Sequence, residues 1–550
     1  MYPKKELAQI VVSACNQFNV DTVVISPGSR NAPLTVGFSN HPAIKTMSIV
    51  DERCAAFFAL GIAQQTQKPV AILCSSGSAL LNYYPAIAEA YYSQIPLIVI
   101  SADRPKHLID IGDGQTIRQE NVFQNHILFS ANLIEQQTKK EFNINLISEA
   151  LQIAISKKGP VHINVPFDEP LYETVEKLDS FEFPKMELKE NLKNHKTEEL
   201  KSIWNASTKK MILVGTNYPE KELQTILNDF EKDTSVIILT ETTSNIAAEL
   251  TINSIDKVIF PFSDEEMNDM KPEVLITFGG MVVSKKIKQF LRKHQPNHHW
   301  HIDALKSMNT YHCLSEYINE KPSSFLSELV KENVVESNYQ QKWLSEKENR
   351  KEKHQQYLKE IDFSDLKAFE QILNTIPANS QLQLSNSSIV RYAQLFDVND
   401  TFKVFCNRGT SGIDGSTSTA IGAAVAEKHQ TVFVTGDLSF FYDSNALWNT
   451  YIPSDFRIIV VNNSGGGIFR FIPGPKSTNA LDYFETPHQL TAEHLSKMYK
   501  FEYVKANSLL ELTSEFKSFY KASNQPKILE IFTDKEVNEK VLKEYFNFLK

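Results

Sequence analysis

The chain has 550 residues, of which 42% are hydrophobic and 22% charged, and its formal net charge at pH 7 is −9. This composition is that of a soluble globular protein, and the length suggests about three or four domains. The negative charge argues against a nucleic-acid partner, and no apolar run reaches the ~18 residues that a membrane span requires. The first residues lack the apolar core of a signal peptide, and five scattered cysteines without a CxxC pair are typical of a reduced, cytoplasmic protein.

The first block of the chain alternates strand-like apolar runs with helix-like stretches as far as Asp168. The strand-like runs include Thr22–Ile25, Val70–Cys74 and residues 96–100. This alternation predicts a parallel sheet covered by helices. The stretch that follows, residues 187–201, is dense in Lys, Glu and Asn and is interpreted as a linker.

A second α/β rhythm follows, with strand-like runs at residues 210–215, 235–240 and Val274–Phe278. It has no obvious GxGxxG fingerprint, so we expect this block to bind no cofactor. Residues 341–360, rich in Lys, Glu and Gln, suit a solvated helix that buries little and joins the next block. The sequence therefore predicts an α/β protein of three doubly wound parallel-sheet domains, at residues 1–185, 200–340 and 361–550.

Short turns rich in small residues follow several strand-like runs of the first block. They are SPGSRNAP at residues 26–33, SSGSA at 75–79 and SADRP at 101–105. Strand ends are where open α/β sheets hold their ligands, although close packing of helix on sheet explains such turns equally well. Arg30 and Arg104 lie in these turns, and a guanidinium group matches a carboxylate with two parallel hydrogen bonds. A surface or structural ion pair is the alternative for each arginine.

An acidic pair, Asp51-Glu52, stands between an apolar segment and a helix-like run of small residues. A carboxylate at such a junction is usually a helix-start charge, which the helix dipole stabilises. A role in binding becomes the stronger interpretation of Glu52 once a cofactor motif is found elsewhere in the chain.

Two strand-like runs of the third block each end in an oxygen-bearing side chain. Residues 431–435 lead into Gly436-Asp437, and residues 457–461 lead into Asn462-Asn463. A carboxylate and an amide oxygen, with no Cys or His nearby in the sequence, suit Mg²⁺, which shares its other ligand positions with phosphate oxygens. The glycine run 465–467 would let the backbone approach a diphosphate closely. The alternative is an ordinary βαβ unit with a glycine-rich turn.

This pattern resembles the motif of thiamine-diphosphate-dependent enzymes, which is written GDG and is followed by NN. Leu438 stands in place of the last glycine, which matters little if only its backbone is used. SPGSRNAPL, QTIRQ at residues 115–119 and NRGTSGIDG at residues 407–415 resemble the 2-succinyl-5-enolpyruvyl-6-hydroxy-3-cyclohexene-1-carboxylate synthase (MenD) family. The resemblance runs through the first and third blocks in order and spacing, and it is weak in the middle block.

The resemblance implies a role for each matched residue. Glu52 would be the catalytic residue, hydrogen-bonded to N1′ of the cofactor pyrimidine, and Asp437, Asn463 and Gly465 would bind Mg²⁺, with Mn²⁺ as an alternative. The residues that bind substrate would be Arg30, Arg104, Gln115, Lys285, Ser387, Arg391 and Arg408. The residues that contact thiamine diphosphate would be Ser29, Ser76, Gly77, Asn82, Gly412, Asp414, Gly436, Leu438, Ser439, Gly465, Gly466, Ile468 and Phe469.

Two of these assignments have a specific weakness. Lys285 equally suits the exposed start of a helix. Relatives carry Asn where this chain has Gly114, so a hydrogen bond that this Asn makes to substrate is in question here.

The resemblance also implies a reaction. Enzymes of this family decarboxylate 2-oxoglutarate and add the succinyl-semialdehyde unit to isochorismate in menaquinone biosynthesis, and the two halves of their cofactor site come from different chains. We therefore expect a homodimer or homotetramer with interfacial active sites. The nearest alternative is a 2-oxo-acid decarboxylase or an acetolactate-synthase-like ligase. A flavin or nicotinamide oxidoreductase and an inactive scaffold are more distant alternatives.

Overall fold

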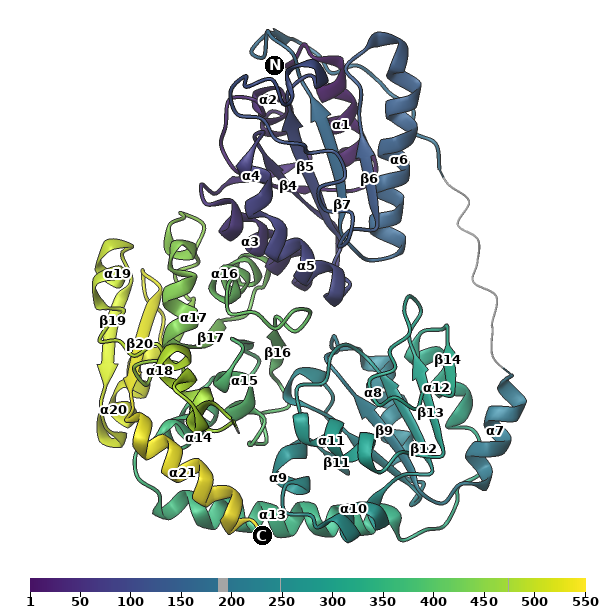
Figure 1. The fold of residues 1–550 in the computed structure, drawn as a ribbon, viewed down its shortest axis with the longest axis vertical. Coiled ribbons are helices and arrows are strands. Elements are labelled where there is room, and N and C mark those ends of the chain that lie inside the picture. Colours follow the sequence, from purple (N-terminus) through teal and green to yellow (C-terminus); the bar gives the residue numbers. More distant parts are fainter. Residues whose placement is uncertain (186–195, 248, 473) are drawn as a thin grey trace.

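The computed structural model describes residues 1–185, 196–247, 249–472 and 474–550. It contains three six-stranded parallel sheets, each packed against helices, which follow one another along the chain (Figure 1). The three doubly wound α/β units that the sequence predicts are therefore present. Most of the predicted linker at residues 187–201 lies outside the described residues, and its last residues belong to helix α7 (Thr197–Ala206).

The N-terminal sheet has the strand order β3-β2-β4-β5-β7-β6. Every side chain of β4 and β5 is buried, because these central parallel strands are apolar runs covered on both faces. Helices α1 (Glu6–Gln17) and α6 (Lys140–Ser156) pack on one face, and α3 (Glu52–Thr66) and α5 (Tyr84–Ser93) pack on the other. The strands are β2 (Thr22–Ile25), β3 (Lys45–Ser48), β4 (Val70–Cys74), β5 (Leu97–Asp103), β6 (Phe129–Asn132) and β7 (Val161–Pro166).

The C-terminal sheet repeats this topology, with the order β16-β15-β17-β18-β20-β19. In both sheets the first strand of the unit lies between the second and the third, so the direction of winding reverses there. This switch point is where doubly wound sheets bind ligands. The strands are β15 (Gln381–Leu384), β16 (Lys403–Cys406), β17 (Thr431–Gly436), β18 (Arg457–Asn462), β19 (Glu502–Ala506) and β20 (Lys527–Phe532).

The central sheet is wound differently, in the order β11-β10-β9-β12-β13-β14. The chain runs outward from β9 on one side and then outward from β12 on the other, as in dinucleotide-binding folds. The strands are β9 (Lys210–Val214), β10 (Val236–Leu239), β11 (Thr251–Ile252), β12 (Val274–Phe278), β13 (His298–Ile302) and β14 (Glu316–Ile318).

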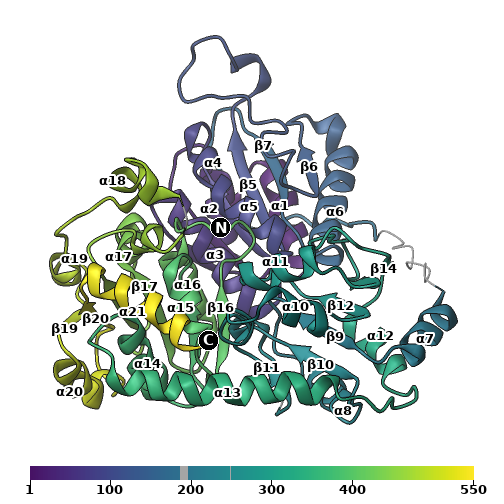
Figure 2. The same cartoon turned by 60° about the horizontal axis from the view of Figure 1, so that its bottom comes forward.

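The charged stretch at residues 341–360 forms helix α13 (Tyr339–Glu360), as predicted, but it is not a solvated joint. The helix runs along the base of both the central and the C-terminal units (Figure 2). Trp343 is fully buried in the central core, and His354 shares a hydrogen bond of 2.7 Å with the Tyr545 hydroxyl in the C-terminal unit. The expectation that this helix buries little was wrong, because a few widely spaced aromatic and apolar side chains between many charges suffice to dock it.

The N-terminal and C-terminal units are joined by the packing of α3 on α16 (Ser416–Ala426). The helices touch backbone to backbone: a Cβ at Gly61 would lie 2.1 Å from the Thr419 carbonyl oxygen, and one at Gly422 would lie 2.0 Å from that of Phe58. Beside this contact the buried Asp443 carboxylate accepts a hydrogen bond of 2.7 Å from the Ser418 N–H. Burial raises the pKa of Asp443 to about 7, although the Ser418 N–H opposes the shift.

Two further properties follow from the described residues. No helix among them combines the length and the low polarity that crossing a membrane would require. The five cysteines are all unpaired, and four of them are buried.

Candidate active site

Asp437 and Asn463 lie side by side at the carboxyl ends of two adjacent strands. Asp437 follows β17 and begins helix α17 (Asp437–Tyr442), and Asn463 follows β18, which pairs in parallel with β17. Both side chains are buried, with 3% and 8% of their surface exposed. The structure therefore places the two predicted metal ligands next to each other, beside the switch point of the C-terminal sheet.

The orientation of the Asn463 amide is fixed by Asp365, the first residue of helix α14 (Asp365–Thr375). The Asn463 Nδ2 donates a hydrogen bond of 2.9 Å to Asp365 Oδ2, and because a carboxylate only accepts, the amide oxygen must point the other way. That oxygen, Oδ1, is buried and has no hydrogen-bond partner. Burial raises the pKa of Asp365 to about 6, and the nearby Asp437 carboxylate adds to the shift, whereas hydrogen bonds from Thr533 and Asn463 lower it.

The Asp437 carboxylate is held in place by backbone groups. It accepts hydrogen bonds from the N–H groups of Leu438 (2.7 Å) and Gly465 (2.9 Å). Gly465 has φ +145°, and a Cβ there would lie 2.4 Å from the Glu485 carbonyl oxygen, so only glycine fits. His488 Nε2 lies 3.2 Å from Asp437 Oδ2.

The oxygen donors of Asp437 and Asn463 decide whether a divalent cation would fit between the two strand ends. The Asn463 amide oxygen is an unpartnered hard donor beside the buried Asp437 carboxylate. The Gly465 carbonyl oxygen, two residues further along, accepts a hydrogen bond of 3.0 Å from the Gly467 N–H. Mg²⁺ prefers hard oxygen donors and takes only a few of them from the protein. The residues present therefore fit a small divalent cation that completes its shell with other oxygens.

Asn386 connects the loop that follows β15 to the loop that follows β16. Its Nδ2 donates hydrogen bonds of 2.7 Å to the carbonyl oxygens of Asn407 and Gly412, and its Oδ1 accepts one of 2.7 Å from Arg408 Nη1. Ser439 Oγ donates a hydrogen bond of 3.1 Å to the Ile413 carbonyl oxygen. Hydrogen bonds thus connect the predicted residues Arg408 and Gly412 through Asn386, and Ser439 joins the same loop through Ile413.

Two predicted arginines, Arg391 on helix α15 (Ser388–Ala393) and Arg408 after β16, lie close together. Burial lowers the pKa of Arg391, and the positive charge of Arg408 lowers it further. Arg391 donates a hydrogen bond to the carbonyl oxygen of Ser387, whose φ of +68° is unusual for a residue with a side chain. The buried Nε of Arg408 has no hydrogen-bond partner. Two guanidinium groups this close together, one of them with an unpartnered donor, are an arrangement that a bound anion would stabilise.

The central unit closes one side of this arginine pair. Met281 Sδ lies 3.9 Å from Arg408 Nη2 and 3.7 Å from Ser411 Oγ. On helix α11 (Lys285–Lys293), the predicted Lys285 is exposed, whereas Lys288 is half-buried. Burial lowers the pKa of Lys288, and among its charged neighbours Arg408 and Arg391 lower it further while Glu241 raises it.

A second set of predicted residues gathers at the switch point of the N-terminal sheet. Ser76 Oγ donates a hydrogen bond of 2.9 Å to the carbonyl oxygen of Gln115, and the Gln115 side chain donates one back to the Ser76 carbonyl oxygen. The Gly77 N–H donates one of 2.8 Å to Gln119 Oε1. The cofactor turn and the substrate glutamine predicted from the sequence are therefore in contact.

The two arginines of this set each lie near an acidic side chain of the same unit. Arg30 is buried, donates a hydrogen bond of 2.9 Å to the Phe167 carbonyl oxygen and lies 3.2 Å from Glu169. Arg104 Nη1 lies 3.7 Å from Asp113, and the buried Arg104 Nε has no hydrogen-bond partner. A Cβ at Gly114 would start 2.9 Å from Arg104 Nη2, so a longer residue at this position would press against the guanidinium.

Glu52 begins helix α3, and its Oε2 accepts a hydrogen bond of 3.4 Å from the Nδ2 of Asn82. Its neighbours reach the C-terminal unit: Arg53 Nη2 donates a hydrogen bond of 2.9 Å to the carbonyl oxygen of Tyr442. Tyr442 is the last residue of α17, whereas Asp437 is the first, about 8 Å away along the helix axis. Within one chain, the segment around Glu52 therefore meets the end of α17 that is remote from Asp437.

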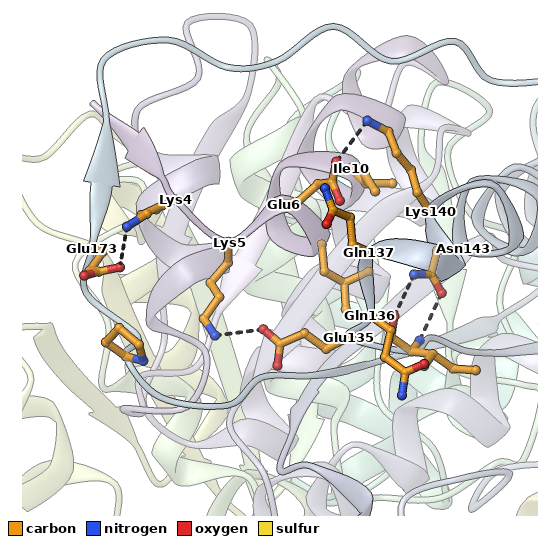
Figure 3. Close-up of a pocket in the computed structure, with 13 residues that line it drawn as sticks. Lys4, Lys5, Glu6, Ile10, Glu135, Gln136, Gln137, Lys140, Asn143 and Glu173 are labelled. Carbon is orange, nitrogen blue, oxygen red and sulfur yellow. Dashed lines mark hydrogen bonds and ion pairs between the residues drawn. The ribbon is translucent and has the colours of Figure 1, made fainter.

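Two cavities in the N-terminal unit lie apart from Asp437 and Asn463. One, of about 890 Å³, is lined by the segment after β5 and includes Arg104 and Gln119. The other, of about 510 Å³, lies beside the start of α1 and contains none of the predicted site residues (Figure 3). Its charges neutralise one another in the pairs Lys4–Glu173, Lys5–Glu135 and Lys140–Glu6.

The remaining predicted residues are in the expected segments. Ile468 and Phe469 form the turn η5 (Gly467–Arg470), where the Phe469 ring packs against Phe484. Asp414 Oδ1 would lie 2.1 Å from a Cβ at Gly412. Ser29 is exposed in the turn after β2.

Sequence reasoning missed several residues that shape the site. Asp365 and His488 are far in sequence from the ligands that they contact, and neither belongs to a motif. Met281 and Lys288 lie in the block where the resemblance is weak. No local signal in the sequence could have found them.

Three family models together match almost the whole chain. Residues 5–131 match the thiamine pyrophosphate enzyme, N-terminal TPP binding domain; residues 181–384 match the middle domain of thiamine pyrophosphate; residues 387–531 match the thiamine pyrophosphate enzyme, C-terminal TPP binding domain.

Curated relatives match over the full length of both chains. The chain is 55% identical to a 2-succinyl-5-enolpyruvyl-6-hydroxy-3-cyclohexene-1-carboxylate synthase of Flavobacterium johnsoniae and 54% identical to that of Flavobacterium psychrophilum, covering 100% of each chain. It is 37% identical to the synthase of the same name from Porphyromonas gingivalis, covering 100% of this chain and 98% of that one.

Proposed function

The chain belongs to the 2-succinyl-5-enolpyruvyl-6-hydroxy-3-cyclohexene-1-carboxylate synthase family of thiamine pyrophosphate enzymes, and we propose that it acts on 2-oxoglutarate and isochorismate. The reaction decarboxylates 2-oxoglutarate and adds its succinyl-semialdehyde unit to isochorismate, as a transferase of menaquinone biosynthesis. The observation that carries this proposal is the identity of 53–55% over the full length of named synthases.

Thiamine diphosphate, when bound, supplies the electron sink that lets a 2-oxo acid lose carbon dioxide. Mg²⁺, or Mn²⁺ in its place, would be held by the Asp437 carboxylate, the Asn463 amide oxygen and the Gly465 carbonyl oxygen. The glycine turn at residues 465–467, whose N–H groups donate to Asp437, Glu485 and Gly465, and the Ser439 hydroxyl would lie beside the diphosphate. Glu52 would hold and release a proton at the pyrimidine N1′ atom.

The arginines would bind the carboxylates of the two substrates. Arg391 and Arg408 favour a bound anion, since their like charges lie close together and the buried Arg408 Nε has no hydrogen-bond partner. Arg30 would have to exchange its present contact with Glu169 for a substrate carboxylate. Arg104, Gln115 and Ser387 would orient the substrates, and Lys285 or its half-buried neighbour Lys288 would reach them from the central unit.

Asp365→Asn is expected to weaken Mg²⁺ affinity by about 10–100-fold, as is typical when a residue that orients a metal ligand is changed. The neutral amide offers only one acceptor to Asn463 and Thr533, so the Asn463 oxygen is no longer fixed. Titration of Mg²⁺ into protein with excess thiamine diphosphate, followed by intrinsic fluorescence, measures the affinity. Thr533→Val is the control, because it removes the other hydrogen bond to Asp365 without touching Asn463. Equal Mg²⁺ affinity in Asp365→Asn and wild type would contradict the role.

We also propose that the active site is completed by a second copy of the chain. The segment around Glu52 meets the end of α17 remote from Asp437, so one chain does not bring these two groups together by that contact. Large apolar side chains are exposed near both segments: Val50 lies just before Glu52, Leu81 lies next to Asn82, which contacts Glu52, and Tyr442 and Trp448 follow Asp437 in the chain. A homodimer, or a tetramer built from two dimers, would cover them and join the Glu52 of one chain to the Asp437 of the other.

Co-expression of Glu52→Gln and Asp437→Ala chains tests this assembly. If each site uses Glu52 and Asp437 from different chains, every mixed dimer contains one intact site. Activity should then recover to roughly one quarter of the wild-type value, since half of the dimers are mixed and half of their sites are intact. A mixture as inactive as its two parents would show that both residues act within one chain.

The reaction itself is tested by incubating the purified protein with thiamine diphosphate, Mg²⁺, 2-oxoglutarate and isochorismate while following isochorismate by absorbance. Loss of isochorismate is expected only when both substrates and the cofactor are present. Release of carbon dioxide from 2-oxoglutarate at an unchanged isochorismate level would instead indicate a 2-oxo-acid decarboxylase or a ligase with another acceptor. A cytoplasmic location, for which the unpaired cysteines are the support, stays a prediction.

A further inference from the structure

A buried carboxylate of the N-terminal unit binds the backbone of the C-terminal unit. Glu89 on helix α5 has only 2% of its surface exposed. Its carboxylate accepts hydrogen bonds from the N–H groups of Gly409 (2.7 Å) and Thr410 (2.6 Å) and from the Thr410 hydroxyl (2.9 Å). A fourth hydrogen bond, of 2.8 Å, comes from Ser93 on the same helix.

This contact requires a carboxylate at position 89 and a glycine at position 409. Two consecutive backbone N–H groups converge on the two Glu89 oxygens, which is how backbone segments bind anions. A Cβ at Gly409 would lie 2.6 Å from the Glu89 carbonyl oxygen and 3.0 Å from its Cδ, so any side chain at position 409 would push the two units apart. The glycine that follows Arg408 is thus required by the approach of α5.

The bound segment connects two groups of the proposed active site. Arg408 directly precedes Gly409, and Gly412 and Asp414 follow Thr410 within one short loop. On its far side the loop is fixed by Asn386, which contacts both Arg408 and the Gly412 carbonyl oxygen. Glu89 therefore supplies the second anchor of this loop, from a different unit of the chain.

Helix α5 is also connected to the central unit, which faces it from below in Figure 1. Lys306 Nζ donates a hydrogen bond of 2.6 Å to the carbonyl oxygen of Tyr92, and the Gln94 amide donates one of 3.3 Å to Asp303. The end of α5, which belongs to the N-terminal unit, thus contacts both of the other units. These contacts fix where the Arg408 loop lies relative to all three units.

On the basis of the proposed function, we infer that Glu89 is a positioning residue, which sets the place of the Arg408 guanidinium and of the loop from Gly412 to Asp414. Glu89 touches neither substrate nor cofactor in this role. It acts through the backbone of residues 409–410, so its loss should loosen the loop and weaken substrate binding more than it weakens the fold.

Glu89→Gln is the principal test, with Glu141→Gln as the matched control on an exposed face of α6. The Gln side chain keeps the size of Glu but turns one acceptor into an NH₂ group that faces a backbone N–H. We expect KM for one or both substrates to rise by about 10-fold or more, with a smaller change in kcat. We also expect faster amide hydrogen exchange in peptides that cover residues 407–415, while peptides from the core strands β4 and β18 stay protected.

Thr410→Ala and Thr410→Ser provide a milder series, which also decides the matter if Glu89→Gln does not fold. The alanine variant loses one hydrogen bond to Glu89 and should show a smaller effect in the same direction, and serine should restore the wild-type values. Wild-type KM and wild-type exchange of residues 407–415 in folded Glu89→Gln, or in Thr410→Ala if the former does not fold, would overturn the inference. Hydrogen exchange needs no substrate, so it reports on Glu89 even if the wild-type protein fails to use isochorismate, which would overturn the proposed function alone.

Discussion

Glu52→Gln is expected to lower turnover by about 10²–10⁴-fold, the range typical for loss of a positioned acid–base group. The amide has the shape of the carboxylate and can still accept the hydrogen bond from Asn82, so the start of helix α3 should be unchanged. It cannot exchange a proton with the pyrimidine nitrogen. Binding of thiamine diphosphate should therefore be nearly retained while the chemistry is lost.

Steady-state kinetics with both substrates, together with calorimetric titration of thiamine diphosphate, separate these two effects. Glu141→Gln, which makes the same change on an exposed helix surface, should leave both quantities as in the wild type. Full activity in Glu52→Gln would show that the acid is only a helix-start charge.

Asp437→Ala is expected to abolish Mg²⁺-dependent binding of thiamine diphosphate. Residues that merely orient a metal ligand cost about 10–100-fold in affinity, so removal of a ligand itself should cost at least about 100-fold. The change also removes the acceptor of the Leu438 and Gly465 N–H groups, which shape the turn that would face the diphosphate.

Calorimetry at several Mg²⁺ concentrations measures this loss directly. Asp455→Ala is the matched control, because Asp455 is exposed near the opposite end of β18. Unchanged cofactor affinity in Asp437→Ala, with the normal dependence on Mg²⁺, would refute the metal role.

Much of the fold could be predicted because buried parallel strands have a clear sequence signature. The predicted strands Val70–Cys74 and Val274–Phe278 are β4 and β12 with the same ends, since strands covered on both faces read as continuous apolar runs. The ends of such strands then show where ligand-binding side chains can lie, and this rule placed Asp437 and Asn463 at adjacent strand ends.

The other features of the site and the fold could not be predicted, because they depend on contacts between residues that are distant in sequence. The Asp365 carboxylate that orients Asn463, and the Glu89 carboxylate that binds Gly409, read as ordinary helix-surface charges until the sheets are assembled. The docking of α13 was hidden for a related reason, because a few side chains such as Trp343 are buried between many charged ones. The shared topology of the N-terminal and C-terminal sheets was hidden as well, since no repeat is visible in the sequence by eye.

Mass spectrometry of the complete reaction, with 2-oxoglutarate labelled with ¹³C at every carbon, tests the proposed activity most directly. We expect a product whose mass is the sum of isochorismate and 2-oxoglutarate less one carbon dioxide, which carries every labelled carbon of 2-oxoglutarate except C1, and which is absent without thiamine diphosphate. Release of labelled carbon dioxide and free succinic semialdehyde, with isochorismate left unconsumed, would contradict the account.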